Sequence, residues 1–196
     1  MNLSLAFLCV LLAMVGVTSA EGQSGAAKPN PRVSLETSEG TVVLELFAKD
    51  APKSVDNFLQ YVKSGFYDGT IFHRVIAGFM IQGGGFDTAG KQKTTREPIQ
   101  NEADNRVRNE RGTVAMARTG DPNSATAQFF VNLKDNGFLN HSGKNPQGWG
   151  YTVFGKVTGG MDVVDRIAQV RTSQGRISEA VPLEQVMIEK ATATRP

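Results

Sequence analysis

One arginine stands in an otherwise apolar stretch of this chain, and its neighbours suggest a binding site. The stretch "FHRVIAGFMIQGGGF" covers residues 72–86 and contains Arg74, Phe79, Met80 and Gln82. A guanidinium stays protonated and donates several hydrogen bonds, whereas Phe and Met offer flat or flexible apolar surface. This set has no acid, base or nucleophile. It therefore suits binding an apolar group and rotating it, rather than breaking a bond by proton transfer.

Sequence motifs for other kinds of site are incomplete. His73 and His141 are far apart, and no His, Cys or carboxylate cluster has ligand spacing, so we predict no metal and no cofactor. The glycines at 83–85 are not followed by Lys and Ser or Thr, which excludes a phosphate-binding loop. The carboxylates of "NEADN" (101–105) are acid/base candidates, although a polar turn is the simpler interpretation. We predict that His73 is a hydrogen-bonded core residue and that His141 lies in a loop.

Composition indicates one folded domain. The 196 residues are 40% hydrophobic and 20% charged, with a formal net charge of +2. This charge is too small and too scattered to indicate binding to nucleic acid or to an anionic membrane surface.

The N-terminus has the pattern of a secretory signal peptide. An apolar run of thirteen residues, Leu5–Val17, is followed by the small residues Thr18 and Ala20. The run is shorter than the ~20 residues of a membrane-spanning helix. We predict a signal peptide over 1–20, cleaved after Ala20, with no membrane association afterwards. An uncleaved anchor and a buried N-terminal helix remain alternatives.

The rest of the chain divides into a lead-in and a domain. Residues 21–31, "EGQSGAAKPNP", predict a flexible lead-in, and 32–196 the folded domain. The only cysteine, Cys9, lies in the predicted signal peptide, so the mature chain would have no thiol. A chain without thiols suits an oxidising compartment, and we expect an exported protein.

Periodicity predicts mostly β-structure with two helices. Alternation over 32–47 predicts a hairpin with Gly in its turn. A helix follows at 50–65, with Asp50 as its cap and Val55, Phe58, Leu59 and Val62 on one apolar face. A second helix is predicted at 160–170. Short strands between and after the helices then indicate an antiparallel barrel or sandwich with helical caps; they are "TIFHRVI", "FMIQGG", "GTVAMA", "AQFFVNL", "YTVFGKV" and "PLEQVMIEKATA".

Three stretches together resemble the cyclophilins, a family of peptidyl-prolyl cis-trans isomerases. They are "FHRVIAGFMIQGG", "AMARTGDPNSATAQFFVN" and "FLNH…GYTVFGKVTGGMDVVDRI". The resemblance runs from Val33 to Ala193 and is nearest to the exported bacterial members. It implies a mainly β fold: an eight-stranded antiparallel closed barrel capped by two α-helices, with the site on its outer face.

The resemblance also implies roles for individual residues. Arg74 is the catalytic arginine and Gln82 its assistant. The remaining substrate-binding positions are Phe79, Met80, Ala117, Arg118, Thr119, Gln128, Phe130, Phe138, Leu139 and Tyr151. Strand alternation predicts that Phe130 points out to the groove, while Phe72, Ile76 and Phe129 point inward.

Three positions depart from the pattern of many members. Phe138 stands where they carry Trp, Tyr151 where they carry His, and Arg118 where they carry Asn. Proline isomerisation should survive, because the catalytic arginine is retained. Cyclosporin binding should be weak, because Phe138 lacks the indole N–H of Trp.

The resemblance therefore implies a periplasmic prolyl isomerase. It would act on Xaa-Pro bonds of unfolded or extended polypeptides and assist their folding after export, as a monomer without a cofactor. The alternative is a chaperone module that grips proline segments, with turnover only incidental.

Overall fold

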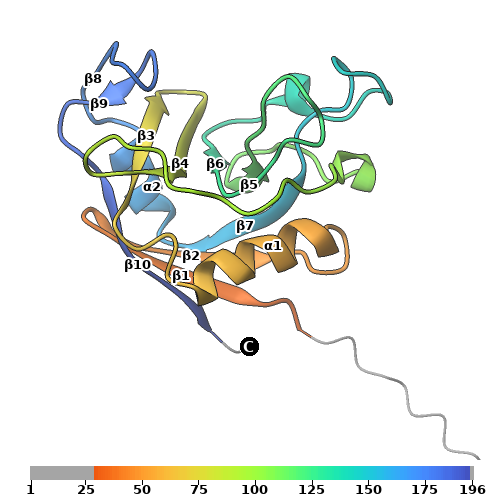
Figure 1. The fold of residues 1–196 in the computed structure, drawn as a ribbon, viewed down its shortest axis with the longest axis horizontal. Helices are drawn as coiled ribbons and strands as arrows, with labels where there is room; N and C mark the ends of the chain where they lie inside the picture. Colours follow the sequence, from red (N-terminus) through yellow and green to blue (C-terminus); the bar gives the residue numbers. More distant parts are fainter. Residues whose placement is uncertain (1–28, 195–196) are drawn as a thin grey trace, which may run out of the picture.

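The computed structural model of the chain describes residues 29–194, so the predicted signal peptide and most of the lead-in lie outside the described residues. Eight strands close into an antiparallel barrel, as the resemblance implied (Figure 1). In their order around the barrel they are β1 (Arg32–Thr37), β10 (Met187–Thr194), β3 (Thr70–Ile76), β4 (Met80–Asp87), β6 (Phe129–Asn132), β5 (Thr113–Met116), β7 (Val153–Gly159) and β2 (Gly40–Leu46).

Smaller elements surround the barrel. They are α1 (Pro52–Lys63), α2 (Met161–Ile167), the 3₁₀ turns η1 (Ala103–Asn105) and η2 (Gly137–Leu139), and a two-stranded sheet of β8 (Thr172–Ser173) and β9 (Val181–Pro182). Helix α1 packs against β7 and β10, and α2 packs against β2. Both predicted helices are confirmed. The β8–β9 sheet was not predicted, because two-residue strands carry no periodic signal.

Strands β1 and β2 form the predicted hairpin. Thr37 pairs with Gly40, which leaves a two-residue turn of Ser38 and Glu39. The Thr37 hydroxyl donates to the Gly40 carbonyl at 2.6 Å and accepts from the Glu39 N–H at 3.2 Å. Gly40 has a φ of +126°, a conformation that favours glycine.

Helix α1 is capped by a residue far away in sequence. Asp50 was predicted as the cap, but the N-cap position is Ala51 and no side chain caps it locally. Instead the carboxylate of Glu102 accepts hydrogen bonds from the N–H groups of Lys53 and Ser54 at 3.0 and 2.9 Å. An anion is favoured there because the first N–H groups of a helix lack partners. Glu102 therefore acts as a structural residue, which removes it as an acid/base candidate.

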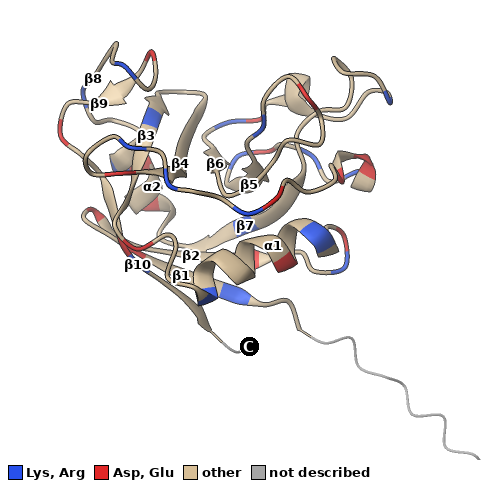
Figure 2. Cartoon of the chain, viewed as in Figure 1, with Lys and Arg blue, Asp and Glu red and all other residues tan. Residues whose placement is uncertain are grey.

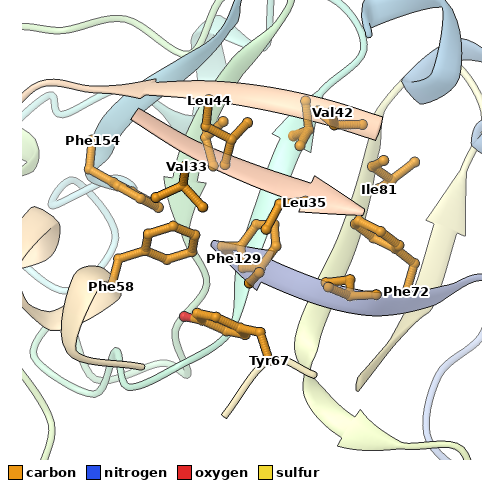
Figure 3. Packing of buried hydrophobic residues seen from close by; sticks show 14 of the residues in the cluster. Val33, Leu35, Val42, Leu44, Phe58, Tyr67, Phe72, Ile81, Phe129 and Phe154 are labelled. Atoms are coloured by element: carbon orange, nitrogen blue, oxygen red, sulfur yellow. The ribbon is translucent and has the colours of Figure 1, made fainter. Parts of the chain in front are cut away.

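A continuous apolar core fills the inside of the barrel. We call this cluster the barrel core. It includes Val33, Leu35, Val42, Leu44, Val55, Phe58, Val62, Tyr67, Phe72, Val75, Ile81, Phe129 and Phe154. The side chains labelled in Figure 3 point toward one another between the strands. The rings of Phe58 and Phe129 meet edge to face at 5.4 Å. Three of the four predicted apolar residues of α1 are buried in this core, and Leu59 packs against it half-buried.

The side chains of β3 do not alternate strictly between the inner and outer faces of the barrel. The register between β3 and β4 shifts twice, between Thr70 and Phe72 and again between Phe72 and Arg74. Phe72 and Val75 consequently belong to the barrel core, whereas Arg74 and Ile76 face outward. The prediction that Ile76 points inward is wrong. No register shift separates Arg74 from Ile76, so these two residues share a face, and the bulge before Arg74 puts Phe72 on the other one.

Charged residues of both signs are spread over the loops, helices and strand ends (Figure 2). The only charged residue within β3 is Arg74. In the part of the chain from 29 to 194, no helix is long and apolar enough to cross a membrane.

Candidate active site

A pocket of about 270 Å³ opens on the outer face of the barrel. It is lined by Arg74, Phe79, Met80, Gln82, Ala117, Arg118, Phe130, Phe138, Leu139 and Tyr151. Ten of the twelve predicted site residues therefore lie together. The other two, Thr119 and Gln128, line an adjoining hollow that shares Gln82, Ala117 and Arg118 with the pocket. The two hollows are therefore neighbours on the outer face of the barrel.

The floor of the pocket is a second apolar cluster, separate from the barrel core. This groove cluster consists of the buried residues Met80, Ala115, Phe130, Leu139 and Val153. Phe130 is 4% exposed and lies in the groove cluster, while the adjacent Phe129 is fully buried in the barrel core. The predicted orientations of both phenylalanines are confirmed.

Aromatic rings form the rim of the pocket. Phe138, in η2, stacks on Phe79 with ring centroids 5.7 Å apart, and it is 73% exposed. Tyr151 meets Phe130 edge to face with ring centroids 5.7 Å apart. The guanidinium of Arg118 lies 4.5 Å from the centre of the Tyr151 ring. The exposed ring of Phe138 therefore leaves apolar surface open to solvent at the rim of the pocket.

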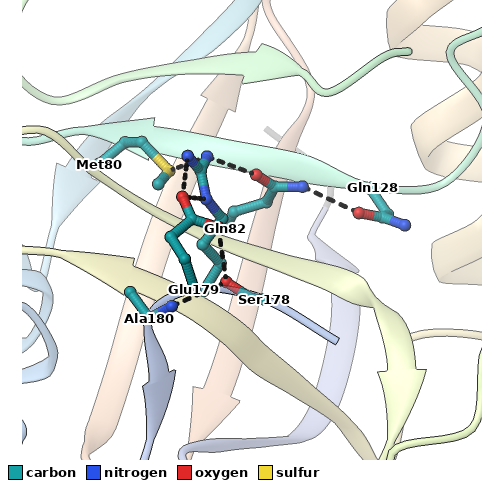
Figure 4. A network of polar contacts seen from close by, with 7 residues as sticks. Met80, Gln82, Gln128, Ser178, Glu179 and Ala180 are labelled. Carbon is teal, nitrogen blue, oxygen red and sulfur yellow. Dashed lines mark hydrogen bonds and ion pairs between the residues drawn. The ribbon is translucent and has the colours of Figure 1, made fainter. Parts of the chain in front are cut away.

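Arg74 begins a chain of polar contacts along the pocket (Figure 4). Its Nη1 donates to Oε1 of Gln82 at 3.4 Å and lies 3.9 Å from the sulfur of Met80. The Gln82 amide in turn donates to Oε1 of Gln128 at 2.9 Å. The predicted partnership of Arg74 and Gln82 is thus present in the geometry. Gln128 extends it into the adjoining hollow.

The strongest contact of Arg74 is with a residue that sequence reasoning missed. Glu179 accepts hydrogen bonds through Oε1 from Nε of Arg74 at 2.8 Å and from Nη2 at 2.6 Å. This bonding from Arg74 holds the pKa of Glu179 below its ordinary value. Glu179 lies in the segment between β8 and β9, 105 positions from Arg74. No motif or periodicity marks it, so only the folded chain reveals the pair.

The consecutive glycines lie inside β4 and allow close packing. Strand β4 continues through all three of them. Gly84 has a φ of +77°, and a Cβ there would lie 2.8 Å from the Tyr67 ring and 2.9 Å from that of Phe129. A Cβ on Gly85 would lie 2.5 Å from the Gln128 side chain. The glycines therefore make room for the barrel core on one side and for Gln128 on the other.

His73 is buried next to Arg74 but does not line the pocket. It is 3% exposed, packs against Phe86 with ring centroids 4.6 Å apart, and its Nδ1 has no hydrogen-bond partner. Burial is the main cause that lowers its pKa to about 4. The prediction of a core histidine is confirmed. Its Nδ1, however, lacks the hydrogen bond that we expected the residue to make. His141 lies in a loop, where Nδ1 is 3.0 Å from the Trp149 carbonyl oxygen.

The chemistry that the pocket offers is narrow. Its lining residues include no carboxylate, imidazole, amine or thiol. Within residues 29–194, no group of three or more His, Cys, Asp and Glu side chains could hold a metal ion. The pocket combines an apolar floor, aromatic walls and two guanidinium groups, those of Arg74 and Arg118. Such a site can hold a small apolar ring and donate a hydrogen bond to an atom of that ring.

The fold and the site agree with a sequence comparison. Residues 32–193 match the family profile described as "Cyclophilin type peptidyl-prolyl cis-trans isomerase/CLD". This chain belongs to the cyclophilin family. The match includes the whole barrel except the final residue of β10. The enzyme class of this cyclophilin is therefore that of the peptidyl-prolyl isomerases.

Individual relatives are similar over most of their length. A peptidyl-prolyl cis-trans isomerase of Streptomyces antibioticus is 64% identical over 159 residues, which are 81% of this chain and 96% of the relative. Peptidyl-prolyl cis-trans isomerase A of Dickeya dadantii is 50% identical over 184 residues, 93% and 95% of the two chains. A crystal structure of a Cryptosporidium parvum cyclophilin, determined in the presence of the dipeptide Ala-Pro, is 27% identical with a TM-score of 0.69. It covers 84% of this chain and 99% of the solved one.

Proposed function

We propose that this cyclophilin rotates Xaa-Pro peptide bonds with Arg74 as its catalytic residue and the groove cluster as the seat of the prolyl ring. The observation that carries this proposal is the guanidinium of Arg74 at the edge of an apolar pocket whose lining offers no carboxylate, imidazole, amine or thiol as an acid or base. The reaction requires neither, because no covalent bond forms or breaks and no proton needs to move.

The barrier to be lowered comes from the electronic structure of the peptide bond. Delocalisation of the nitrogen lone pair into the carbonyl makes rotation cost ~18–20 kcal/mol. Uncatalysed exchange at an Xaa-Pro bond therefore takes roughly tens to hundreds of seconds. In the twisted transition state the prolyl nitrogen becomes pyramidal and regains its lone pair. A hydrogen-bond donor aimed at this nitrogen stabilises the transition state more than either ground state.

Arg74 can supply this donor at every working pH, because a guanidinium stays protonated. A hydrogen bond from a charged donor contributes about 1.5–3 kcal/mol. That energy corresponds to roughly a ten- to hundredfold rate increase. Gln82 supports this role, since it accepts a hydrogen bond from Nη1 of Arg74 and so limits where Nη1 can move.

The remaining acceleration would come from holding the prolyl ring while the preceding carbonyl turns. Met80, Phe130 and Leu139 form a buried floor for that ring, and Phe79 and Phe138 stack beside it. At about 270 Å³ the pocket is just below the ~300–1,000 Å³ typical of ligand pockets, which suits one small ring. The Ala117–Thr119 backbone and Gln128 line the adjoining hollow, where we propose that the substrate chain continues.

The direct test is the rate of cis-trans exchange of an Ala-Pro peptide, measured by NMR exchange spectroscopy. We expect the wild type to accelerate exchange and Arg74→Ala to lose roughly ten- to a hundredfold in kcat/KM. Arg166→Ala is the matched control, because Arg166 is an exposed arginine of α2 that also pairs with a carboxylate. A wild type that binds the peptide without accelerating its exchange would instead indicate a proline-binding chaperone module.

We also propose that the protein is exported, acts in the periplasm and assists the folding of extended polypeptides there as a monomer. The support is the apolar run Leu5–Val17 with small residues up to Ala20, followed by the polar segment 21–31. Mass spectrometry of the protein from a cell fraction tests the cleavage. A mature N-terminus at Glu21 is expected, and one at Met1 would contradict it. Sedimentation of the mature protein tests the monomer.

Weak cyclosporin binding is a further part of the proposal. Phe138 is exposed at the rim of the pocket and presents only a hydrocarbon edge, where many cyclophilins carry an indole N–H. We expect Phe138→Trp to bind cyclosporin more tightly than the wild type by roughly tenfold, the value of one added hydrogen bond. Isothermal titration calorimetry of both proteins measures the difference, and equal affinities would reject this explanation.

A further inference from the structure

We propose that Glu179 is a positioning residue for Arg74: its carboxylate holds one edge of the guanidinium so that the other edge faces the pocket. The inference rests on the proposed role of Arg74 in catalysis and adds a residue from outside the pocket. Glu179 does not line the pocket, and its side chain is 59% exposed. It would act only through Arg74.

The five N–H groups of the guanidinium divide into two sets. On one edge, Nε and Nη2 both donate to Oε1 of Glu179, at 2.8 and 2.6 Å. At the other edge, Nη1 faces Gln82 and the sulfur of Met80, which are both pocket-lining residues. A charged carboxylate is a strong acceptor, whereas a thioether is a weak one. The strongly held edge is therefore away from the pocket, and the weakly held edge is the one that a substrate nitrogen can reach.

The backbone around Glu179 is fixed along β3. The N–H of Val75 donates to the Ala180 carbonyl at 2.9 Å, on the residue next to Glu179. The Ser178 hydroxyl accepts from the Ala180 N–H at 3.1 Å and donates to Oε2 of Glu179 at 3.3 Å. Figure 4 shows the contacts among Ser178, Glu179 and Ala180 in one network with Gln82. The carboxylate is thus held in place before any substrate arrives.

The opposite role for Glu179 would be to draw Arg74 away from the substrate. The geometry argues against it, because the carboxylate occupies Nε and Nη2 and leaves Nη1 on the pocket side. An exposed ion pair is also screened by solvent, so partial neutralisation of Arg74 is a small effect. The larger effect of Glu179 is to order the long side chain of Arg74, because an arginine without a partner distributes itself over many rotamers.

The test compares kcat and KM of the full mature chain and three variants on an Ala-Pro peptide. We expect Glu179→Ala to lower kcat roughly three- to tenfold with little change in KM, because the seat of the prolyl ring is untouched. Glu179→Gln keeps an acceptor oxygen and should retain an intermediate kcat. Asp162→Asn is the control: it removes the carboxylate of another exposed pair, 2.9 Å from Arg166 on α2, and should leave kcat unchanged.

A second measurement reports on the position of Arg74 without using activity. In the wild type, the Nε–H of Arg74 should give an NMR resonance protected from solvent exchange, assigned by its loss in Arg74→Lys. It should lose that protection in Glu179→Ala and keep it in Asp162→Asn. An unaffected resonance, or a Glu179→Ala enzyme with undiminished kcat, would overturn the inference. If the wild type itself does not accelerate exchange, the proposed function is refuted instead. The wild-type rate alone therefore distinguishes the two failures.

Discussion

Phe129 and Phe130 are neighbours on β6 with the same side chain, yet they belong to two different apolar clusters. Phe129 is fully buried among the rings of Phe58, Tyr67 and Phe72 in the barrel core. Phe130 forms part of the groove cluster, where the pocket opens to solvent beside it. One cluster is closed on all sides and the other is left incomplete. Burial stabilises the fold in both, but only the incomplete cluster leaves apolar surface free for a ligand.

The strongest test of this difference exchanges the two phenylalanines separately for alanine. Phe129→Ala should lower the free energy of unfolding by about 3–5 kcal/mol, because it leaves a cavity in a closed core. Phe130→Ala should cost less stability, since solvent can enter the vacated space, and should instead raise KM for an Ala-Pro peptide. Urea unfolding and exchange kinetics measure the two effects. Equal stability losses with unchanged KM for both variants would abolish the distinction between the clusters.

A smaller effect should come from His73, which adjoins Arg74 but behaves as an interior residue. Its pKa is about 4 in the folded chain and near 6.5 when unfolded, so the unfolded state binds more protons between these values. Stability should therefore fall as pH decreases from 6.5 to 4, by about 2–3 kcal/mol in total from this group. Above about pH 7.5, where His73 is deprotonated in both states, the contribution is constant.

The control for this pH dependence is His73→Gln, which cannot titrate. The free energy of unfolding of wild type and variant, measured from pH 4 to 7, should converge as the pH falls. Parallel curves would mean that His73 titrates normally and is not part of the interior.

The smallest effect on stability is expected at the rim of the pocket. Phe138 is 73% exposed and stacks only on Phe79, so Phe138→Ala should change the free energy of unfolding by less than about 0.5 kcal/mol. Its loss should still weaken peptide binding a few-fold, because one wall of the pocket disappears. A large drop in melting temperature for Phe138→Ala would show that the rim is structural and would blur the contrast with the barrel core.

Much of this organisation could be predicted from local sequence patterns. The hairpin of β1 and β2, the buried face of α1 and the opposite directions of Phe129 and Phe130 all follow from periods of two or 3.6 residues. The resemblance to cyclophilins supplied the closed barrel and the set of site residues, ten of which line one pocket. These features depend on residue type and spacing, which a sequence displays directly.

Three features depended on tertiary structure. Phe72 and Ile76 lie on opposite faces of β3 because the β3–β4 register shifts between them, and a bulge leaves no periodic trace. Glu102 rather than Asp50 caps α1. Glu179 reaches Arg74 from an irregular segment 105 residues away. By itself the sequence determined which residues could form the site and which faces of the elements are apolar. Closure of the barrel decided which distant carboxylates satisfy a helix end and a guanidinium, because such pairings depend on proximity in space and not along the chain.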